Sequence, residues 1–377
     1  MGSGWRFAAG VVAATAVAAM AAGCSGTVES PADGSPGRTS GSDGASLAPS
    51  PVPSPQHSES APQSSESQPP PTVRLAFGGD SYAEGPLEWR LANDPKGFVG
   101  PFSRVFRRAD LAMVNLETAI TTAGTPEPKA FTFAATRDVL PALGAAGIDV
   151  VSLANNHGMD FGWPGFTQTL AAKRWSDSPA VIGIGKDEAE AYEPWIGEAA
   201  GQRIAFFTAT QVLDDHLAEK WTAGPDKGGL ASAYRLDYLT ERIAQTRSEV
   251  DTVVVYLHWG VERYTCPVDS QVDLAKALKR AGADVIVGGH QHRLSGGGMM
   301  GDAFVHYGLG NFLFQAASEG AEKTGVLTVD VRGREVVGYR WHPGRIYNAV
   351  PQKLTGADRD AESAYWESLR SCTGLKP

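Results

Sequence analysis

Short apolar runs alternate with amphipathic stretches along the chain from about residue 73 onward. The runs are rich in Val, Ile and Leu and end in Gly or polar residues, as buried strands do. They predict strands at residues 73–77, 111–114, 148–153, 203–208, 252–257, 284–287 and 304–307. Apolar residues at helical spacings or a Pro near the start predict helices at residues 137–146, 164–175, 234–250, 271–281 and 361–369. The pattern is therefore that of an α/β protein.

Polar residues with metal-ligand chemistry follow five of the predicted strands. They are Asp80, Glu117, Asn156, His258 and His290. In α/β sheets the ligand site lies beyond the carboxyl ends of the strands, so these residues are expected to converge. With His292, they provide two carboxylates, one amide oxygen and three imidazoles. This set suits a hydrolytic centre that holds two metal ions.

Each of these residues also has a simpler interpretation when it is considered alone. Asp80, after Gly-Gly, suits a helix N-cap, and Glu117 suits a surface carboxylate at a strand end. Asn156 suits a turn, and His258 suits a buried core histidine. The His-x-His pair that begins at His290 is the most specific signal. The combination, in this order and at the strand ends, favours the metal centre.

The start of the chain predicts export. Residues 1–23 contain Arg6, then an uncharged Ala-rich stretch that is shorter than the ~20 apolar residues of a membrane span. Small residues precede Cys24, as in bacterial lipoprotein signal peptides, where the Cys is acylated. An ordinary signal peptide that is cleaved near Ala22 is the alternative.

A linker is predicted to follow the acylated Cys, over residues 24–72. It has no aromatic residue and is dominated by Ser, Pro and Gly, so it cannot bury enough apolar surface to fold. It would tether a folded domain, residues 73–350, and a helical tail, residues 351–377. The expected location is the outer face of the bacterial cytoplasmic membrane, with the lipid as the anchor.

The charge of the chain excludes one class of partner. Its 33 Lys and Arg against 42 Asp and Glu give a formal net charge of −9, whereas a nucleic-acid-binding protein needs a basic surface. This acidic balance also gives no indication of tight capture of a polyanion.

The remaining cysteines leave two alternatives open. With Cys24 acylated, Cys266 and Cys372 either form a disulfide, which an exported protein permits, or remain two unpaired thiols.

Six sequence blocks resemble the CapA-type poly-γ-glutamate capsule synthesis proteins. They are FGGD at 77–80, NLET at 115–118, VSLANNHGMDFG at 151–162, LHWG at 257–260, GGHQHR at 288–293 and GLGNFLF at 308–314. That family is similar in fold to the calcineurin-like metallophosphoesterases. The resemblance therefore implies a four-layer α/β/β/α sandwich with a dinuclear metal site.

The resemblance also implies a role for each residue of the site. Asp80 and His292 would bind the first metal, Glu117 would bridge both, Asn156, His258 and His290 would bind the second, and His157 would act on the leaving oxygen. Tyr82 stands where the wider superfamily has a histidine ligand. A neutral phenol is a poor ligand, so the first metal position is one ligand short.

These observations together predict an exported, metal-dependent hydrolase-like lipoprotein. It would act in assembly or release of a capsule or envelope polymer, with poly-γ-glutamate implied by the resemblance alone. Two divalent ions (Mn, Fe or Zn) would activate water to attack a phosphoester or an amide. The alternative is a non-catalytic scaffold of a membrane-bound synthesis or export complex, which the missing histidine ligand favours.

Overall fold

The computed structural model describes residues 70–175 and 179–377, which belong to the compact unit Glu66–Pro377. The predicted signal peptide, Cys24 and nearly all of the predicted linker lie outside the described residues. Among the helices that are described, none is long and apolar enough to cross a membrane.

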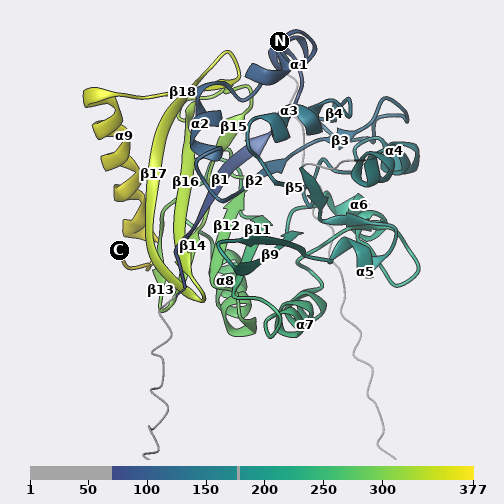
Figure 1. Cartoon of the computed structure of the whole chain (residues 1–377). Helices are drawn as coiled ribbons and strands as arrows, with labels where there is room; N and C mark the ends of the chain where they lie inside the picture. The colour runs from purple at the N-terminus through teal and green to yellow at the C-terminus, as the bar shows by residue number, and fades with distance from the viewer. Residues whose placement is uncertain (1–69, 176–178) are drawn as a thin grey trace, which may run out of the picture. The chain divides into compact units, whose positions relative to one another are not determined.

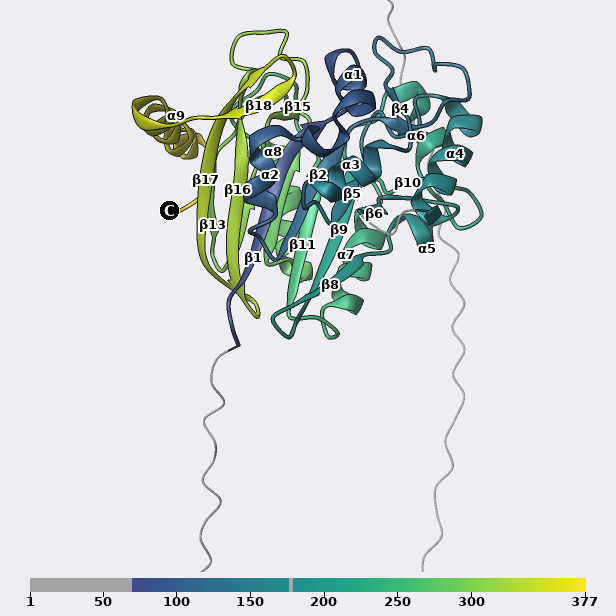
Figure 2. The ribbon, with the colours of Figure 1, turned by 45° about the horizontal axis from the view of Figure 1, so that its top comes forward.

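The larger of two main sheets has eight strands, in the order β18-β17-β16-β1-β2-β5-β6, with β15 also paired to β1. Figure 2 shows β17, β16, β1 and β2 side by side. The strands β1, β2, β5 and β6 are parallel, and β16, β17 and β18 are antiparallel to their neighbours. Their bounds are β1 (Val73–Ser81), β2 (Leu111–Leu116), β5 (Val150–Ser152), β6 (Ala180–Ile182), β15 (Asn311–Leu313), β16 (Lys323–Arg332), β17 (Glu335–Tyr347) and β18 (Val350–Lys353).

The smaller sheet has six strands, in the order β13-β14-β12-β11-β9-β8. Its four central strands are parallel, and β8 and β13 pair antiparallel at the two edges. Their bounds are β8 (Trp195–Ala199), β9 (Gln202–Thr210), β11 (Thr252–His258), β12 (Val285–Gly289), β13 (Gly297–Met300) and β14 (Ala303–His306).

The two sheets pack face to face, and their central parallel strands are buried on both faces. Phe77 of β1 and Tyr256 of β11 lie in one core between the sheets. Their sequence neighbours Ala76 and Val255 point the opposite way, into two further cores beneath the helices. Side chains alternate across a strand, so a sheet that is covered on both faces needs continuous apolar runs. This is why the strands are visible in the sequence as unbroken hydrophobic segments.

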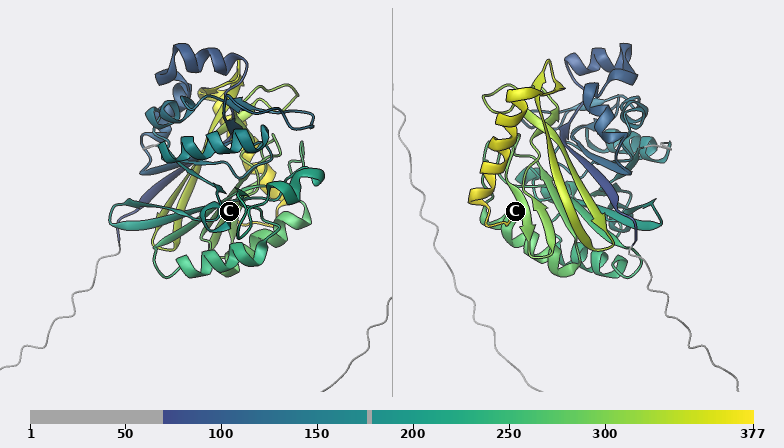
Figure 3. Two further views of the ribbon diagram at one scale, coloured as in Figure 1. Left: turned by 90° about the vertical axis from the view of Figure 1, so that its right-hand side faces the viewer. Right: turned by 60° about the vertical axis from the view of Figure 1, so that its left-hand side comes forward.

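Helices cover the outer face of the parallel strands in each sheet (Figures 1 and 3). Apolar residues of α1 to α4 pack on the larger sheet, and those of α7 and α8 pack on the smaller sheet. The helices are α1 (Pro86–Asn93), α2 (Ser103–Phe106), α3 (Val139–Ala145), α4 (Gly162–Trp175), α5 (Glu188–Ala191), α6 (Asp215–Trp221), α7 (Leu236–Thr246), α8 (Asp269–Ala281) and α9 (Gly356–Ser368). The four layers confirm the predicted α/β/β/α fold class.

Short elements complete the described part of the chain. Two small ladders pair β3 (Ala119–Ile120) with β4 (Ala134–Ala135), and β7 (Ile184–Gly185) with β10 (Gly229–Leu230). Three 3-10 turns are η1 (Pro95–Gly97), η2 (Gly100–Phe102) and η3 (Leu369–Cys372).

The C-terminal segment is fastened to the sandwich at two places. Trp366 of α9 donates a hydrogen bond from Nε1 to Nε2 of the buried His306, 2.8 Å away, and stacks on Trp341. A disulfide then joins Cys372 to Cys266, with 5.7 Å between the Cα atoms. It closes a loop of 106 residues, and on the chain-entropy model such a crosslink stabilises the folded state by roughly 4–5 kcal/mol. Residues 351–377 are thus part of the same compact unit.

All seven predicted strands and five predicted helices have counterparts, with shifts at the ends. The helix predicted over 234–250 is α7, which stops at Thr246. The side chain of Arg247, the C-cap residue, contacts the carbonyl oxygens of Val250 and Asp251 and the carboxylate of Asp284. The last helix begins at Gly356, before its predicted start at residue 361.

Candidate metal centre

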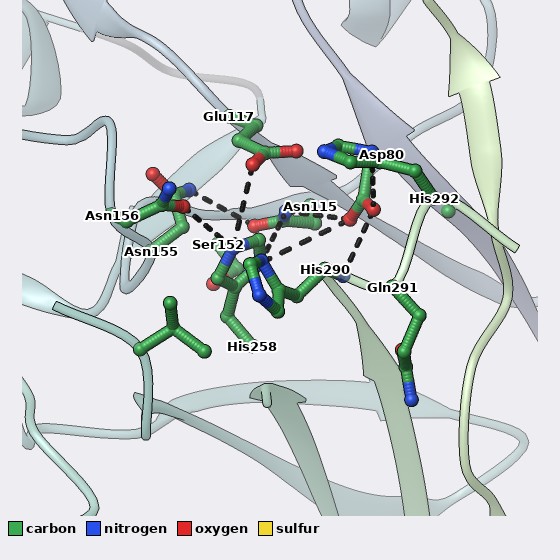
Figure 4. A network of polar contacts seen from close by, with 12 residues as sticks. Asp80, Asn115, Glu117, Ser152, Asn155, Asn156, His258, His290, Gln291 and His292 are labelled. Carbon is green, nitrogen blue, oxygen red and sulfur yellow. Dashed lines mark hydrogen bonds and ion pairs between the residues drawn. The ribbon is translucent and has the colours of Figure 1, made fainter. Parts of the chain in front are cut away.

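The six predicted ligands meet where the carboxyl ends of the two sheets come together (Figure 4). Asp80 ends β1, Glu117 and Asn156 follow β2 and β5, His258 ends β11, and His290 and His292 lie in the loop after β12. Asp80, Glu117 and His258 are completely buried, and His290 is 5% exposed. Residues up to 212 positions apart in sequence therefore share one buried cluster (292 − 80).

Their donor atoms form two overlapping groups. One group is Glu117, His258 and His290, and the other is Asp80, Glu117 and His292. In each group the donor atoms lie within 4.8 Å of one another. Asn156 borders the first group, with its Oδ1 2.7 Å from Nε2 of His258. Glu117 belongs to both groups, so its carboxylate lies between two candidate metal positions.

Unpaired buried atoms test whether this pocket suits cations. Three buried atoms, both carboxylate oxygens of Glu117 and Nδ1 of His290, have no hydrogen-bond partner among the described residues. Burial, and next the carboxylate of Asp80, raises the pKa of Glu117 well above its ordinary value. A buried carboxylate without a partner is strongly destabilising, and a divalent cation would supply the missing charge and contacts. The donor set therefore fits divalent metal ions.

The Gly-Gly blocks of the sequence allow the close approach of these elements. A Cβ at Gly289 would lie 2.2 Å from Oδ1 of Asp80, and one at Gly79 would lie 1.9 Å from the carbonyl oxygen of Gly310. The following His290 and His292 have φ of 93° and 52°, which non-glycine residues rarely adopt. Such backbone strain is concentrated at functional sites, because it aims side chains that relaxed geometry would not.

Asparagine side chains fix the orientation of the proposed ligands. Asn115 donates from Nδ2 to Oδ1 of Asp80 at 2.9 Å, and the backbone N–H of His290 donates to Oδ2 at 2.9 Å. Asn311 places its Oδ1 2.7 Å from Nδ1 of His292, and the same nitrogen lies 3.5 Å from Oδ2 of Asp80. Asn155 holds Asn115 in turn, at 3.0 Å. Gln291, between the two histidines, points away from the cluster (Figure 4) and donates to a backbone carbonyl.

His157 faces the centre from the side but belongs to neither ligand group. Its Nε2 is 3.9 Å from Oε1 of Glu117, and its Nδ1 is 2.6 Å from Oδ2 of Asp160. Lys129 holds the other oxygen of Asp160 at 3.0 Å, and Phe133 stacks on the imidazole at 4.1 Å. Burial, and next the Lys129 ammonium, lowers the pKa of His157 well below its ordinary value. The ring is therefore held in one orientation and is neutral at rest.

Lys129 and Asp160 were missed as site residues by reasoning from the sequence. Asp160 lies inside the VSLANNHGMDFG block, three residues after His157, which is a local signal for a partner of that histidine. Lys129 lies in a loop without any motif. Its ammonium also contacts Asp214, 3.1 Å away, and the carbonyl oxygen of Asn156.

Tyr82 is part of an aromatic wall beside the centre. Its ring stacks on Phe314 at 4.2 Å and meets the edge of Phe133 at 5.1 Å. Burial raises the pKa of its phenol to about 12, so the group is neutral. Phe133 and Phe314 contact the rings of His157 and His292 respectively. In the position that a histidine ligand would take, this chain thus has a residue that packs against the rings supporting the site.

A two-sheet sandwich with carboxylate, amide and imidazole donors at the strand ends defines an α/β protein with a candidate metal centre. Residues 74–316 match the family described as bacterial capsule synthesis protein PGA_cap, and the chain belongs to this family.

Curated relatives carry names from capsule synthesis. The chain is 27% identical over 288 residues to "PGA biosynthesis protein CapA" of Bacillus subtilis, which covers 74% of this chain and 73% of that protein. It is 29% identical over 227 residues to "Capsule biosynthesis protein CapA" of Bacillus anthracis, covering 59% and 54%. It is 28% identical over 229 residues to a "Probable polyglutamine synthesis accessory protein" of Mycobacterium tuberculosis, covering 58% of each. The chain thus spans little more than half the length of the last two.

Two solved structures are also similar. A hypothetical protein from Thermus thermophilus is 17% identical, with a TM-score of 0.47, over 73% of this chain and 100% of that one. A "Putative 5'-Nucleotidase" from Staphylococcus aureus is 14% identical, with a TM-score of 0.45, over 79% and 58%.

Proposed function

We propose that this protein is a membrane-anchored, extracytoplasmic hydrolase with a dinuclear metal centre that acts on a glutamate polymer of the envelope. The observation that carries the proposal is Glu117, whose two buried oxygens have no hydrogen-bond partner among the described residues and lie between two ligand groups. The names of the relatives, which refer to PGA and polyglutamine, support the polymer as the substrate class. The reaction would release or trim polymer by cleaving an amide or a phosphoester.

The residues of the chain would divide the chemistry as follows. Bound divalent ions supply Lewis acidity and lower the pKa of water. Glu117 would hold the two positions together, and Asp80 is kept in place by Asn115. His157 would take a proton from the attacking water at Nε2 and pass it to the leaving oxygen or nitrogen, because Asp160 fixes Nδ1. The aromatic wall of Tyr82, Phe133 and Phe314 would exclude water from that side.

The full chain, loaded with Mn²⁺, Fe²⁺ or Zn²⁺, is expected to hydrolyse bis(p-nitrophenyl) phosphate or a γ-linked glutamate oligomer. Chelation should abolish the turnover and the same metal should restore it, because the donor set binds the ions that the chemistry needs. Release of coloured p-nitrophenolate measures the phosphoesterase reaction, and release of free amine measures cleavage of the oligomer. A chain that holds metal but turns over neither substrate contradicts the enzymatic proposal.

A non-catalytic scaffold is the second candidate, and Tyr82 is the observation that favours it. This buried phenol occupies the position of a ligand, which leaves Asp80, Glu117 and His292 as the donors of one group. The word "accessory" in the name of the mycobacterial relative agrees with this interpretation. Bound metal would then have a structural role, and the partner would be a membrane-bound synthesis complex.

Membrane attachment through Cys24 is the proposal for the N-terminal segment. Cys24→Ala is expected to move the protein from the membrane fraction to the soluble fraction, because two acyl chains anchor stably where one does not. Ser25→Ala is the matched control and should leave the protein in the membrane. Fractionation followed by immunoblotting measures both variants. Unchanged membrane association of Cys24→Ala would show that the anchor is something other than this lipid.

A further inference from the structure

A basic cavity lies on the outer face of the larger sheet, away from the metal centre. Its volume is about 210 Å³, and it is bounded by β1, β16, β17, β18 and the segment around α2. Figure 2 shows β1, β16 and β17 side by side. Six basic or imidazole side chains line it: Arg74, Arg104, Arg108, Arg340, His342 and Lys353. We call these residues the basic cavity.

Strand register explains why these side chains share one face. Arg74 of β1 is opposite Asp330, and two residues along β16 Thr328 is opposite Arg340 of β17. Lys353 of β18 is opposite a glycine four residues beyond Arg340, which keeps the same parity. Because side chains alternate across a strand, Arg74, Arg340 and Lys353 project to the same side of the sheet.

The charge of the basic cavity is largely uncompensated. Arg74 has a carboxylate partner, Asp330, at 2.7 Å. The side chains of Arg104, Arg108 and Arg340, and likewise that of Lys353, form no ion pair with any described residue. In a chain with a net charge of −9, such a concentration of unpaired cations is unexpected for a surface without a function.

The positive charge of the basic cavity also affects the pKa of His342, which lines it. Burial, and next the cations of Lys353, Arg340 and Arg74, lowers the pKa of His342 to about 4. The imidazole is therefore neutral and adds no further repulsion. Its Nε2 is 3.2 Å from the hydroxyl of Thr328, so polar atoms as well as charges line the recess.

We propose that the basic cavity binds carboxylate groups of an anionic polymer, a run of γ-linked glutamates being the class that fits. Guanidinium groups bind carboxylates as planar forks, which suits a recess framed by three arginines without a partner. A concave site on several strands also favours a chain segment over a flat lipid surface, which binds a polybasic protrusion. This inference rests on the proposed function for the identity of the polymer.

The position of the cavity gives it a use that is distinct from chemistry. Arg74 and Asp80 lie on the same strand, six residues apart, which corresponds to about 20 Å at the rise of an extended strand. Polymer held in the cavity would thus be retained on the protein at a distance from the metal centre. The acidic surface elsewhere on the protein would repel the rest of the polymer, so the polymer would bind only at the cavity.

The test compares two double variants that remove the same charges. Arg340→Ser/Lys353→Ser changes the cavity, and Lys276→Ser/Arg280→Ser changes exposed residues of α8, on the other sheet. A fluorescent γ-linked glutamate 10-mer is titrated into the full chain at low salt, and anisotropy gives Kd. The cavity variant is expected to bind about ten-fold or more weakly, because each charge-assisted contact is strong, and the control should match the wild type. A γ-linked glutamate 10-mer whose α-carboxyl groups are amidated should bind poorly to all three.

Three results would overturn the proposal. They are equal affinity of the two double variants, equal affinity for the glutamate probe and its amidated form, and binding of phosphatidylglycerol vesicles that depends on the basic cavity while the glutamate probe does not bind. Metal content and turnover of bis(p-nitrophenyl) phosphate, measured on the same preparations, separate this inference from the proposed function. Cavity-dependent binding in a chain without turnover refutes the hydrolase and leaves the polymer site. Turnover without cavity-dependent binding refutes the polymer site and leaves the hydrolase.

Discussion

Glu117→Ala is expected to remove bound metal from both positions, whereas His290→Ala should empty one. The reason is that Glu117 belongs to both donor groups and His290 to a single one. Loss of a direct ligand should lower metal affinity by more than the ~10–100-fold that follows from losing an outer hydrogen-bond partner. Elemental analysis of each variant after gel filtration gives the number of ions per chain. Wild-type metal content in Glu117→Ala would exclude it as a bridging ligand.

Two further variants separate loss of a ligand from general damage to the fold. Glu362→Ala removes a buried glutamate that is paired with Lys323 and Arg345, so it should lower stability and leave metal content unchanged. Glu117→Gln removes the charge with little change in size. After chelation it is expected to melt at a higher temperature than chelated wild type, because it no longer buries a carboxylate without a partner. A lower melting temperature would indicate that Glu117 serves the fold rather than a metal.

The apolar runs predicted the α/β class and the positions of the proposed ligands for one physical reason, whereas the four-layer sandwich was implied by the family resemblance. Doubly covered parallel strands are continuous apolar runs, and the first polar residue after each run is at the sheet edge where sites form. Asp80 and His258 are therefore visible without any structure. Asn115 and Asn311 are not, because an asparagine among apolar residues has many structural uses. Their role depends on contacts to Asp80 and His292, across 35 and 19 residues of sequence respectively.

Features that depend on long-range pairing were harder to predict. The hairpin β16–β17 carries the basic cavity and alternates in polarity, yet it ends in no candidate ligand and was not among the predicted strands. The overall charge argued against polyanion binding, because composition averages over faces that register separates. Cys266 and Cys372 could be paired or free on sequence grounds. Their pairing depends on where η3 lies relative to the loop after β11.

His157→Ala is expected to retain its metal and to lose rate selectively. Its Nε2 faces the centre, but the residue belongs to neither donor group. If His157 delivers a proton to the leaving group, its removal should slow the reaction on the order of 10²–10⁴-fold for a poor leaving group such as an alkoxide. p-Nitrophenolate needs no proton, so the same variant should be affected least with that substrate. Metal content, melting temperature and both rates are measured on one preparation.

Asp160 and chemical rescue distinguish proton transfer from packing. Asp160→Asn keeps the size of the side chain that holds Nδ1 but loses its charge, so it should reproduce part of the leaving-group selectivity at unchanged metal content. Added imidazole should restore His157→Ala towards wild type for the poor leaving group, because it can occupy the space against Phe133. His216→Ala, on the exposed α6, should change neither rate. A His157→Ala protein that is metal-free, or one that slows equally on both leaving groups without rescue, would make His157 a structural residue and leave the proposed hydrolase without its proton donor.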